Sequence, residues 1–580
     1  MIFSIFTLFG GLAFFMYGMN QMSGSLEKIA GEKMEYVINK MTSNRFMGLL
    51  LGCIITIAIQ SSSAVTVMLV GLVNSGLMSI ANTVGVIMGS NIGTTITAWL
   101  MSLIGISSDN VAVRMLKPES FAPVMAFIGI VLIMVSRIQK RKEVGNCMIG
   151  FAILMYGMIL MSSSVAPLAD SPAFSKMLTA FETPILGVLS GTVVTAVIQS
   201  SAASIGMLQA LSLTGGITYG MAFPIIMGQN IGTCATAVLS SIGVNKNAKK
   251  VAVIHLSFNI IGTAIFMALY YGLNSIFDFA FTNEKITPMG IALCHSIFNI
   301  GTTVLLLPFS RFLVKIADKT IKTDSSPDKV FLDERLFNTP SVAVAECEIL
   351  SAVMADYAKD GVIKVINNYF DYHKGISDEI NEIENKLDIF EDQIGSYLVK
   401  LIGIELADSD MHKVSKMLHS VDSFERIRDY AAELAQSSFE LQNKKLDISQ
   451  EAKNDLKVVS EAIREIMELT INAYKSNDTS VAKKVEPLER TVDLLISKSR
   501  ARHTNRIQSG VCNLEKGFVF ADTLNAFDRI ADHCSNIALA VLIANEDCFN
   551  QHEYLSKVTS MDNENFKMKY AYYQSKYSLK

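Results

Sequence analysis

An internal repeat constrains this chain of 580 residues more than any other feature of its sequence. Four separate blocks recur further along the chain, and all four are displaced by the same distance, which is that from Met16 to Met155. The matched blocks are MYGM at 16–19 and 155–158, the glycine pairs Gly48/Gly52 and Gly187/Gly191, QSS at 60–62 and 199–201, and NIGT at 91–94 and 230–233. Chance does not keep one register over four blocks, so residues 10–140 and 149–280 are predicted to be two copies of one folding unit.

Charge divides the chain into an apolar part and a polar part. Residues 1–316 hold 17 Lys and Arg and 10 Asp and Glu, whereas residues 317–580 hold 33 and 44. The first part is therefore expected in lipid and the second in water. Residues 1–22 are apolar from the start and lack a basic leader region, which predicts a retained transmembrane helix and not a cleaved signal.

Nine apolar stretches follow one another in the first part, near 1–23, 46–76, 80–105, 120–137, 145–163, 185–214, 218–243, 250–273 and 288–314. Two of them, 46–76 and 185–214, are too long for one crossing of about 20 residues and carry the polar QSS block at their centres. Each is predicted to be a re-entrant hairpin of two half-helices, because polar backbone at membrane depth is tolerated only where protein or water covers it. Seven full crossings remain.

Lysine and arginine residues predict the orientation. If the polar part is cytoplasmic, eleven of them flank the membrane on the inside and four on the outside, in agreement with the positive-inside rule. Three crossings separate corresponding points of the two copies, so the second copy is predicted to be upside down relative to the first. The N-terminus is then outside the cell, and the two hairpins open to opposite sides, as in alternating-access transporters.

Charged helices with apolar residues at 3.6-residue spacing begin near residue 340. Acidic pairs four residues apart recur in them, as in Glu384/Asp388 and Glu489/Asp493, and FERIRD at 424–429 is echoed by FDRIAD at 527–532. These patterns predict a transmembrane domain over 1–316, a linker over 317–340, a soluble helical bundle of two three-helix units over 341–565, and a tail over 566–580.

The Gln60-Ser61-Ser62-Ser63 block and its copy Gln199-Ser200-Ser201 are the first candidate binding elements. The second half-helix of each hairpin starts at the apex, so its free N–H groups and positive dipole end can hold an anion. Serine hydroxyls donate to phosphate oxygens, and hydroxyl and carbonyl oxygens suit sodium. The alternative is that small residues only let the helices pack closely. The second copy of the block favours the binding role over this alternative.

The second candidate elements are GSNIGTT at 89–95 and GQNIGT at 228–233. Two glycines four residues apart are expected to loosen the helix, so that Asn and Thr side chains replace backbone partners or coordinate an ion. Close helix packing through GxxxG is the alternative. Neither motif contains Arg or Lys, so a bound divalent anion would depend on dipoles, hydroxyls and co-transported sodium.

Two further polar patterns have competing interpretations. HxxFNI occurs at His255 and again at His295, and we favour interhelical hydrogen bonding over a role in transport. In the polar part, the carboxylate pairs Glu425/Asp429 and Asp528/Asp532 could ligate a divalent metal, but they could equally pair with nearby arginines at a helix surface.

The doubled motifs QSSSAVTVMLVGLVNSG, GSNIGTT, QSSAAS and GQNIGT resemble the type II sodium–phosphate cotransporter family in its bacterial form, over residues 10–316. The segments FERIRDYAAELA and FDRIADHCSNIA resemble PhoU-like domains, the helical phosphate-regulatory modules. The implied fold is an all-α polytopic membrane protein with two inverted repeats, each with a re-entrant hairpin and a broken helix, followed by a cytosolic PhoU-like bundle.

The resemblance also implies site residues. It places phosphate and sodium at Gln60, Ser61, Ser62, Ser63, Asn91, Thr94, Thr95, Gln199, Ser200, Ser201, Asn230 and Thr233, and metal-cluster ligands of the PhoU-like part at Glu425, Asp429, Asp528 and Asp532. The chain departs from the family pattern at Ala202 and Gln229, where serines are usual, which bears on the number of sodium sites.

The function implied is sodium-coupled symport of inorganic phosphate into the cell across the cytoplasmic membrane, with a regulatory cytosolic domain. The pocket does not by itself name its ligand, so a transporter of another oxyanion or a carboxylate, and a phosphate sensor that does not transport, stay as alternatives. No enzyme motif is present and no nucleic-acid partner is expected, while a homodimer is left open.

Overall fold

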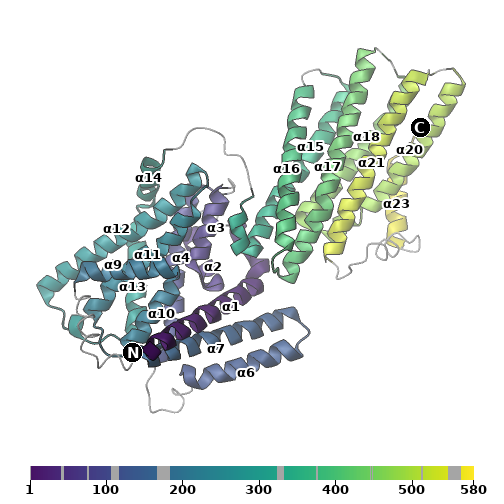
Figure 1. Ribbon diagram of the computed structural model, residues 1–580. Coiled ribbons are helices and arrows are strands. Elements are labelled where there is room, and N and C mark those ends of the chain that lie inside the picture. Colours follow the sequence, from purple (N-terminus) through teal and green to yellow (C-terminus); the bar gives the residue numbers. More distant parts are fainter. Residues whose placement is uncertain are drawn as a thin grey trace. The chain divides into compact units, whose positions relative to one another are not determined.

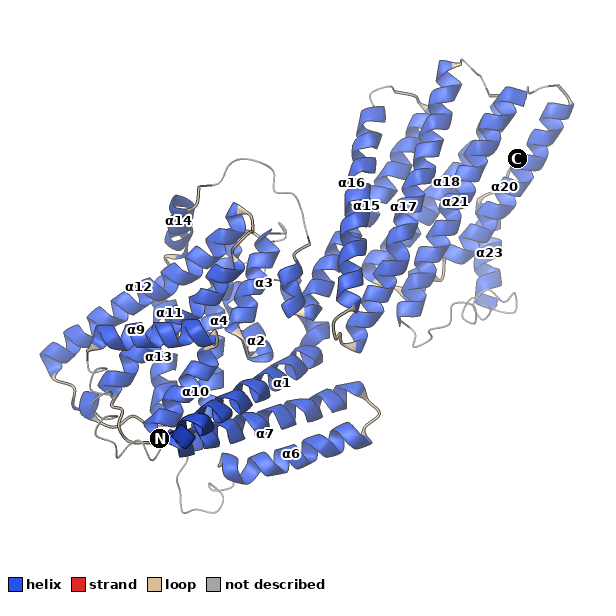
Figure 2. Cartoon of the chain, in the orientation of Figure 1, coloured by secondary structure: helices blue, strands red, loops and turns tan. Residues whose placement is uncertain are grey.

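The computed structural model describes residues 2–40, 45–74, 78–105, 117–165, 183–322, 332–373, 376–444, 446, 448–510, 512, 514–545 and 564–579. These residues form helices, with an isolated bridge between Thr218 and Lys285 as the one pairing of strand type among them. Figures 1 and 2 show the helices along the chain. The chain divides into two compact units, Met1–Ala343 and Val344–Lys580, which are described separately.

The two sequence copies have matching helices in the first unit (Figure 1). The first copy contains α1 (Ile2–Lys40), α2 (Arg45–Ile59), α3 (Ser62–Asn74), α4 (Ile80–Met101), η1 (Ser102–Gly105) and α6 (Pro118–Val135). The second contains α7 (Gln139–Val165), α9 (Pro184–Ile198), α10 (Ser201–Ser212), α11 (Tyr219–Ser240) and α12 (Lys246–Phe277), followed by η4 (Ala280–Asn283), α13 (Pro288–Leu306) and α14 (Ser310–Thr320). The starts of α9, α10 and α11 follow those of α2, α3 and α4 at the displacement of the sequence repeat, so sequence and structure repeat in the same register.

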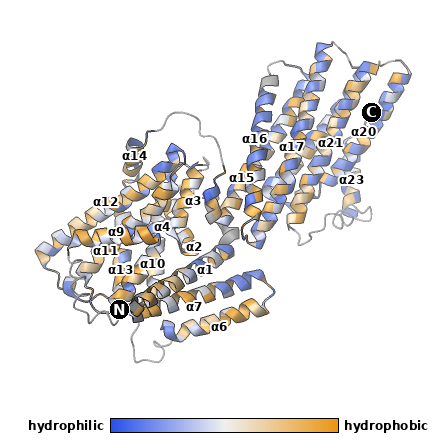
Figure 3. Ribbon diagram, in the orientation of Figure 1, coloured by the Kyte–Doolittle hydropathy of each residue, from blue (hydrophilic) through white to orange (hydrophobic). Residues whose placement is uncertain are grey.

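Six helices in the described part of the chain are long and apolar enough to cross a membrane: α4 with η1, α6, α7, α11, α12 and α13. Large apolar side chains of this unit are exposed, among them Phe127 and Met134 on α6. Figure 3 shows many hydrophobic residues along its helices. A soluble protein rarely exposes so much contiguous apolar surface. The first unit is therefore a membrane protein domain.

Helices α2 and α9 have 15 residues each and are too short to be counted with the six. At 1.5 Å per residue each spans about 22 Å, less than the roughly 30 Å of a bilayer core. Each is followed after two residues by a second short helix, α3 or α10, which contacts it. This helix–break–helix arrangement has the dimensions expected of the two predicted hairpins.

The predicted break in the helix at the GxNIGT motif is wrong. Helices α4 and α11 run without interruption through 89–95 and 228–233. The glycines serve close packing: a Cβ on Gly89 would lie 1.9 Å from the Leu49 carbonyl oxygen, and one on Gly228 would lie 2.0 Å from that of Val188. The backbones of α4 and α2, and of α11 and α9, touch at these points, so the alternative of GxxxG-type packing holds.

Helices α1 and α7, which carry the repeated MYGM block, pack against each other in antiparallel directions. A Cβ on Gly11 would meet Met161 and one on Gly18 would meet Leu154, while Gly150 faces Met22. Residue numbers therefore rise along one helix as they fall along the other. The same contact surface of the repeated unit is used twice, once by each copy.

A short segment after α14 is anchored on the first unit. The turn η5 (Glu334–Asn338) places Leu336 against Gly71 of α3, with 2.8 Å between a leucine methyl carbon and an ideal Cβ on the glycine. Asn74 Nδ2 donates to Asp333 Oδ2 at 3.0 Å, and Arg335 Nη2 donates to the Ile242 carbonyl at 2.9 Å. We call these contacts the η5 anchor; it joins α3 of the first copy to the end of α11 in the second, inside the segment predicted as a linker.

The second unit is a bundle of long helices: α15 (Pro340–Phe370), α16 (Ile376–Ile402), α17 (Asp408–Asn443), α18 (Gln450–Ser476), α19 (Thr479–Ala482), α20 (Val485–Gln508), α21 (Leu514–Asn545) and α23 (Glu564–Lys576). Helix α21 contacts α17, α18 and α20, and its buried Phe527 and Ile530 lie in the core of the bundle. Helix α23 packs on α20, so part of the predicted tail is a helix of this bundle.

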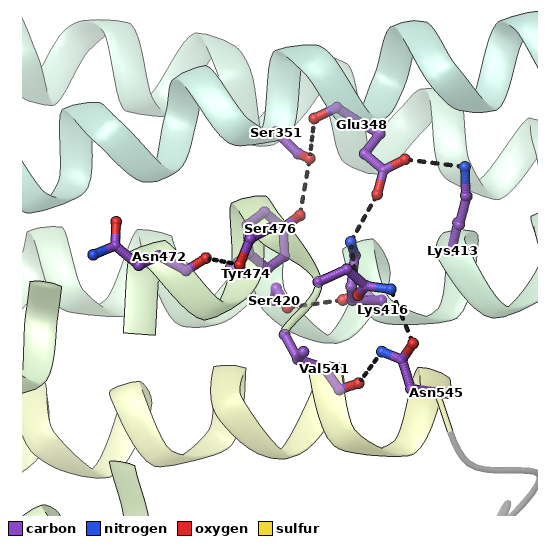
Figure 4. A network of polar contacts seen from close by, with 11 residues as sticks. Glu348, Ser351, Lys413, Lys416, Ser420, Asn472, Tyr474, Ser476, Val541 and Asn545 are labelled. Carbon is purple, nitrogen blue, oxygen red and sulfur yellow. Dashed lines mark hydrogen bonds and ion pairs between the residues drawn. The ribbon is translucent and has the colours of Figure 1, made fainter. Parts of the chain in front are cut away.

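Figure 4 shows a polar network that joins helices of the second unit. Lys416 of α17 is buried and donates to Glu348 of α15 at 2.7 Å, and it lies over the ring of Tyr474 of α18. Lys413 lies 3.4 Å from the other oxygen of Glu348, and the Tyr474 hydroxyl donates to Ser351 at 2.8 Å. The network therefore fixes α15 on α17 and α18.

Replacing Lys416 by methionine is expected to destabilise the protein by about 3 kcal/mol, because it leaves the Glu348 carboxylate half-paired in a buried setting. Burial alone would raise the pKa of Glu348, but Lys416 and Lys413 lower it below its ordinary value of 4.5. The stabilisation is thus fully present above the unfolded pKa and is lost as the pH falls through the lower folded value. Thermal unfolding of the full chain in detergent between pH 3 and pH 7 measures this, and equal stability of wild type and Lys416→Met at pH 7 would contradict it.

Candidate functional site

The breaks at Gln60 and Gln199 have the same local geometry in the two copies. Each glutamine follows the last residue of a helix in the left-handed conformation, with φ of 57° in both. Its backbone N–H donates to the threonine carbonyl four residues earlier, Thr56 or Thr195, at 2.7 Å. The left-handed region costs a residue with a Cβ roughly 1–2 kcal/mol. Both copies therefore hold a residue with a Cβ in the same strained conformation at the same place.

A serine caps the helix that follows each break. Ser61 Oγ accepts from the Ala64 N–H at 3.1 Å, and Ser200 Oγ accepts from the Ala203 N–H at 3.2 Å. Capping by these hydroxyls leaves the earlier N–H groups of the first turn without a partner in the helix. In α3 these belong to Ser62 and Ser63, and in α10 to Ser201 and Ala202. Together with the positive helix end they form the kind of site that binds anions.

The first break is tied to its neighbours by side chains that sequence analysis missed. Thr97 of α4 donates to Gln60 Oε1 at 2.8 Å, and Ser23 of α1 donates to the Ile59 carbonyl at the end of α2. Both donors come from other helices, far from the break in the sequence, so no local motif could indicate them. In the second copy Thr236 takes the place of Thr97, and its hydroxyl donates instead to the Thr233 carbonyl at 2.9 Å.

Gln229 stands where the first copy has Ser90, and a second residue of the same copy, Ser204, differs from its counterpart as well. In the first copy Thr56 donates to Ser90 at 2.8 Å. In the second copy Thr195 donates to Ser204 at 2.9 Å, and the longer Gln229 donates to the same hydroxyl at 2.9 Å. Ser204 occupies the position of Val65. The two exchanges together keep a buried hydroxyl bonded to each threonine.

Asn91 and Asn230 have different partners. Asn91 Nδ2 donates to Asn259 Oδ1 of α12 at 3.2 Å, whereas Asn230 Nδ2 donates to the Ile226 carbonyl of its own helix at 2.9 Å. Asn259 is fully buried and also donates to Cys234 of α11 at 3.2 Å. Asn259 thus joins the NIGT helices of the two copies.

The threonines of the NIGT motifs donate to carbonyls within their own helices. Thr94 donates to Ser90 at 3.0 Å, Thr95 to Ile92 at 2.8 Å and Thr233 to Gln229 at 2.9 Å. A hydroxyl that donates in this way keeps its lone pairs, which can coordinate a cation. The three hydroxyls therefore keep their lone pairs, and the helices that carry them are intact.

The HxxFNI pairs lie in the packed interior. Asn259 donates to the His255 carbonyl at 3.1 Å, and Asn299 donates to the His295 carbonyl at 2.9 Å. Phe258 is buried as well. These two bonds lie within single helices. The predicted interhelical bonds are present at Asn259, which bonds Asn91 and Cys234, whereas Asn299 Oδ1 is buried without a hydrogen-bond partner among the described residues.

In the second unit, Glu425 and Asp429 of α17 lie against an arginine. Arg428 donates to Glu425 at 2.9 Å and to Asp429 at 2.6 Å, and it also contacts Asp388 of α16. Glu425 and Asp429 are therefore ion-paired with Arg428, which was the alternative to metal binding. Asp528 of α21 lies 3.4 Å from Arg500.

Asp532 belongs to a different group. Its carboxylate lies with those of Glu489 and Asp493 of α20, and an oxygen of each residue lies within 4.8 Å of the others. Burial and the neighbouring carboxylates raise the pKa of Glu489 to about 8 and also raise that of Asp493. In the sequence, Glu489 and Asp493 show the four-residue spacing that places two side chains on one face of a helix, and this spacing is the signal for a pair of ligands.

Two family models match this chain. The model described as Na+/Pi-cotransporter matches residues 14–163 and again 153–283, and the model described as PhoU domain matches 352–438 and 456–541. Each model thus matches twice, in agreement with the two kinds of repeat in the sequence.

Several curated proteins are similar over different parts of the chain. A protein from Escherichia coli O157:H7 named for inorganic phosphate export, YjbB, is 19% identical over 564 residues, 95% of this chain and 100% of that protein. YqeW from Bacillus subtilis is 28% identical over 309 residues, 53% of this chain and 94% of that protein. The rat sodium-dependent phosphate transport protein 2A is 34% identical over 100 residues, 17% of this chain and 15% of that protein.

A solved structure, PhoU from Pseudomonas aeruginosa, aligns with 36% of this chain and 98% of its own, at 20% identity and a TM-score of 0.33.

Proposed function

The chain belongs, through residues 14–283, to the Na+/Pi-cotransporter family and carries PhoU domains behind it, and from this premise we propose that it moves inorganic phosphate together with sodium by alternating access. Phosphate transport is the activity for which the family is described. Coupling to sodium, the direction of transport and the residues of the site are parts of the proposal.

The observation that carries the proposal is the pair of strained breaks at Gln60 and Gln199, each followed by a serine-capped helix start. One such start could be a packing feature. Two starts with the same φ, the same carbonyl partner and the same cap supply two sets of N–H donors. We propose that both sets face one tetrahedral dianion, whose four oxygens can accept from both.

Inversion of the second copy is supported by the antiparallel contact of α1 and α7, which carry the same sequence block. A unit that packs on its own copy in the antiparallel direction is related to it by an approximate two-fold axis. Such a relation would make one hairpin accessible from each side of the membrane. With the second unit in the cytoplasm, the N-terminus would lie outside.

Bound sodium would compensate the negative charge of phosphate. The two motifs contain no Lys or Arg, and hydroxyl and amide oxygens of Asn91, Thr94, Thr95, Asn230 and Thr233 line the neighbouring helices. A desolvated dianion without cations would be very unfavourable. We therefore expect phosphate to bind tightly only when sodium is bound as well.

Purified protein in proteoliposomes tests the function. We expect uptake of labelled phosphate with an inward sodium gradient, little uptake in potassium, and no competition by excess sulfate or succinate. Sodium-independent uptake would contradict the coupling. Stronger transport of succinate would favour a carboxylate transporter, and phosphate binding without any transport would favour a sensor.

Export is the second candidate for direction, because the similar protein from E. coli that spans nearly the whole chain is named for phosphate export. An inward sodium gradient favours uptake by a symporter. Cells depleted of phosphate and cells loaded with it distinguish the two, since net efflux that persists against an inward sodium gradient would overturn uptake.

The PhoU part would hold a divalent metal at Glu489, Asp493 and Asp532. Three carboxylates with oxygens within 4.8 Å of one another match the oxygen-rich coordination of Mg²⁺, Mn²⁺ or Ca²⁺. One Glu489 oxygen is buried without a hydrogen-bond partner in the described structure, and a metal would satisfy it. Bound metal would supply positive charge that holds α20 on α21.

Removal of residues 344–580 is expected to leave transport active and to alter its regulation, because the first unit is compact without them. The truncated chain keeps the η5 anchor. Its matched control, a chain that ends at Lys322, loses the anchor but keeps α14. Uptake in proteoliposomes measures both, and a chain ending at Ala343 that folds but does not transport would contradict the prediction.

A further inference from the structure

The two halves of the PhoU part differ at one position of an otherwise repeated motif. FERIRD at 424–429 and FDRIAD at 527–532 align acid with acid and arginine with arginine. Arg428 in the first half, however, stands where the second half has Ala531. Both lie beside the last acid of their motif, so the exchange places or removes a positive charge inside an acidic cluster.

In the first half the guanidinium of Arg428 lies among three carboxylates. It is 2.9 Å from Glu425 and 2.6 Å from Asp429 on α17, and it contacts Asp388 on α16. Only 12% of the Arg428 side chain is exposed. Arg426 lies at the edge of this cluster, 3.7 Å from Glu425 and with 53% of its side chain exposed, so Arg428 is the buried cation among these carboxylates.

In the second half the corresponding carboxylates have no internal cation among the described residues. Ala531 is buried and uncharged, and the nearest arginines, Arg490, Arg500 and Arg529, have side chains 54%, 46% and 61% exposed. Of these, Arg529 donates to Asp532 from the surface, at 3.2 Å. Arg490 Nε lies 3.7 Å from Glu489 Oε2, too far for a hydrogen bond, and that oxygen is buried without a hydrogen-bond partner in the part of the chain that the structure describes. Among the described residues, the second cluster thus lacks a buried cation at the sequence position that Arg428 occupies in the first.

We propose that Arg428 is a built-in substitute for a divalent metal ion, so that the PhoU part binds metal in its second half at Glu489, Asp493 and Asp532 and not in its first. The proposal rests on the metal binding proposed above. A guanidinium repels a dication and already uses the carboxylate oxygens that would coordinate it. In the first half the side chain of Arg428 therefore occupies the position of the metal. In the second half the occupancy of the site depends on the metal concentration.

Reciprocal exchange of the two residues tests this in the full-length protein in detergent, stripped with EDTA and equilibrated with Mn²⁺. Metal per chain is counted by inductively coupled plasma mass spectrometry, and thermal unfolding is measured with and without Mn²⁺. Wild type is expected to bind Mn²⁺ and to melt at a higher temperature with it. Ala531→Arg should lose both effects, with at least tenfold weaker binding.

Arg428→Ala should gain a second site, doubling the Mn²⁺ per chain, and Arg428→Lys, which keeps the charge, should bind the same amount as wild type. If Arg428→Ala does not fold without metal, its recovery by Mn²⁺ supports the proposal. Wild-type binding that survives Ala531→Arg would overturn it, as would an unchanged Mn²⁺ count in folded Arg428→Ala. Absence of Mn²⁺ binding in wild type would overturn the metal site itself, while phosphate transport by the first unit would be unaffected.

Discussion

Replacing Ser62 or Ser201 by alanine is expected to weaken phosphate binding and transport strongly while leaving the protein folded. Each serine is the first residue of the helix that follows a break, where its N–H and hydroxyl are the donors closest to the positive helix end. A hydrogen bond to a charged group is worth about 1.5–3 kcal/mol. Loss of one such bond therefore predicts a decrease in phosphate affinity of roughly tenfold to a hundredfold, and a larger decrease where sodium shares the hydroxyl.

The measurement is sodium-driven phosphate uptake in proteoliposomes, together with the elution profile and melting temperature of each variant. Ser241→Ala is a suitable control, because Ser241 is a half-buried residue just after α11 and its hydroxyl donates to the Val238 carbonyl at 2.7 Å. The control should transport as wild type does. Near-normal uptake by both Ser62→Ala and Ser201→Ala would remove these residues from the site.

Replacing Gly89 by valine is expected to prevent the membrane domain from folding. The Cβ alone would lie 1.9 Å from the Leu49 carbonyl oxygen and 2.9 Å from the Cys53 nitrogen, both of which are backbone atoms of α2. Overpacking of a core by movable side chains costs typically about 1–3 kcal/mol. Here a helix backbone would have to withdraw, so the cost should be larger and the contact between α2 and α4 should be lost.

Gly10→Val provides the matched control, since a Cβ at Gly10 of α1 meets no atom within 4 Å. The yield of monodisperse protein in detergent and its melting temperature distinguish the two variants. Gly228→Val should behave like Gly89→Val, because its Cβ would lie 2.0 Å from the Val188 carbonyl oxygen. Normal yield and stability of Gly89→Val would mean that the two helices are not held at the observed distance.

The repeat made much of the first unit predictable. Its constant displacement placed the starts of α9, α10 and α11, and the polar QSS blocks marked the two breaks. The glycines of GxNIGT were harder to interpret, because a glycine that loosens a helix and a glycine that admits a neighbouring backbone leave the same letter in the sequence. Only the position of Leu49 beside Gly89 distinguishes the two.

The contacts that could not be predicted at the two candidate sites join residues that lie far apart in the sequence. Thr97 reaches Gln60 from another helix, and Asn259 of α12 bonds Asn91 of α4, so neither contact follows from spacing along the chain. The metal ligands proposed from the family motif were drawn from α17 and α21 alone. The cluster with Asp532 instead combines α21 with α20, and its α20 members were visible in the sequence only as a pair with helical spacing.

The segment that forms the η5 anchor contacts both copies of the repeat. Leu336 rests on the first copy at Gly71, while Arg335 holds the end of α11 in the second copy, and Pro340 starts helix α15 two residues after the turn ends. Because Arg335 and Leu336 are neighbours in the chain, a movement of one copy that strains its contact with this segment also strains the contact with the other copy.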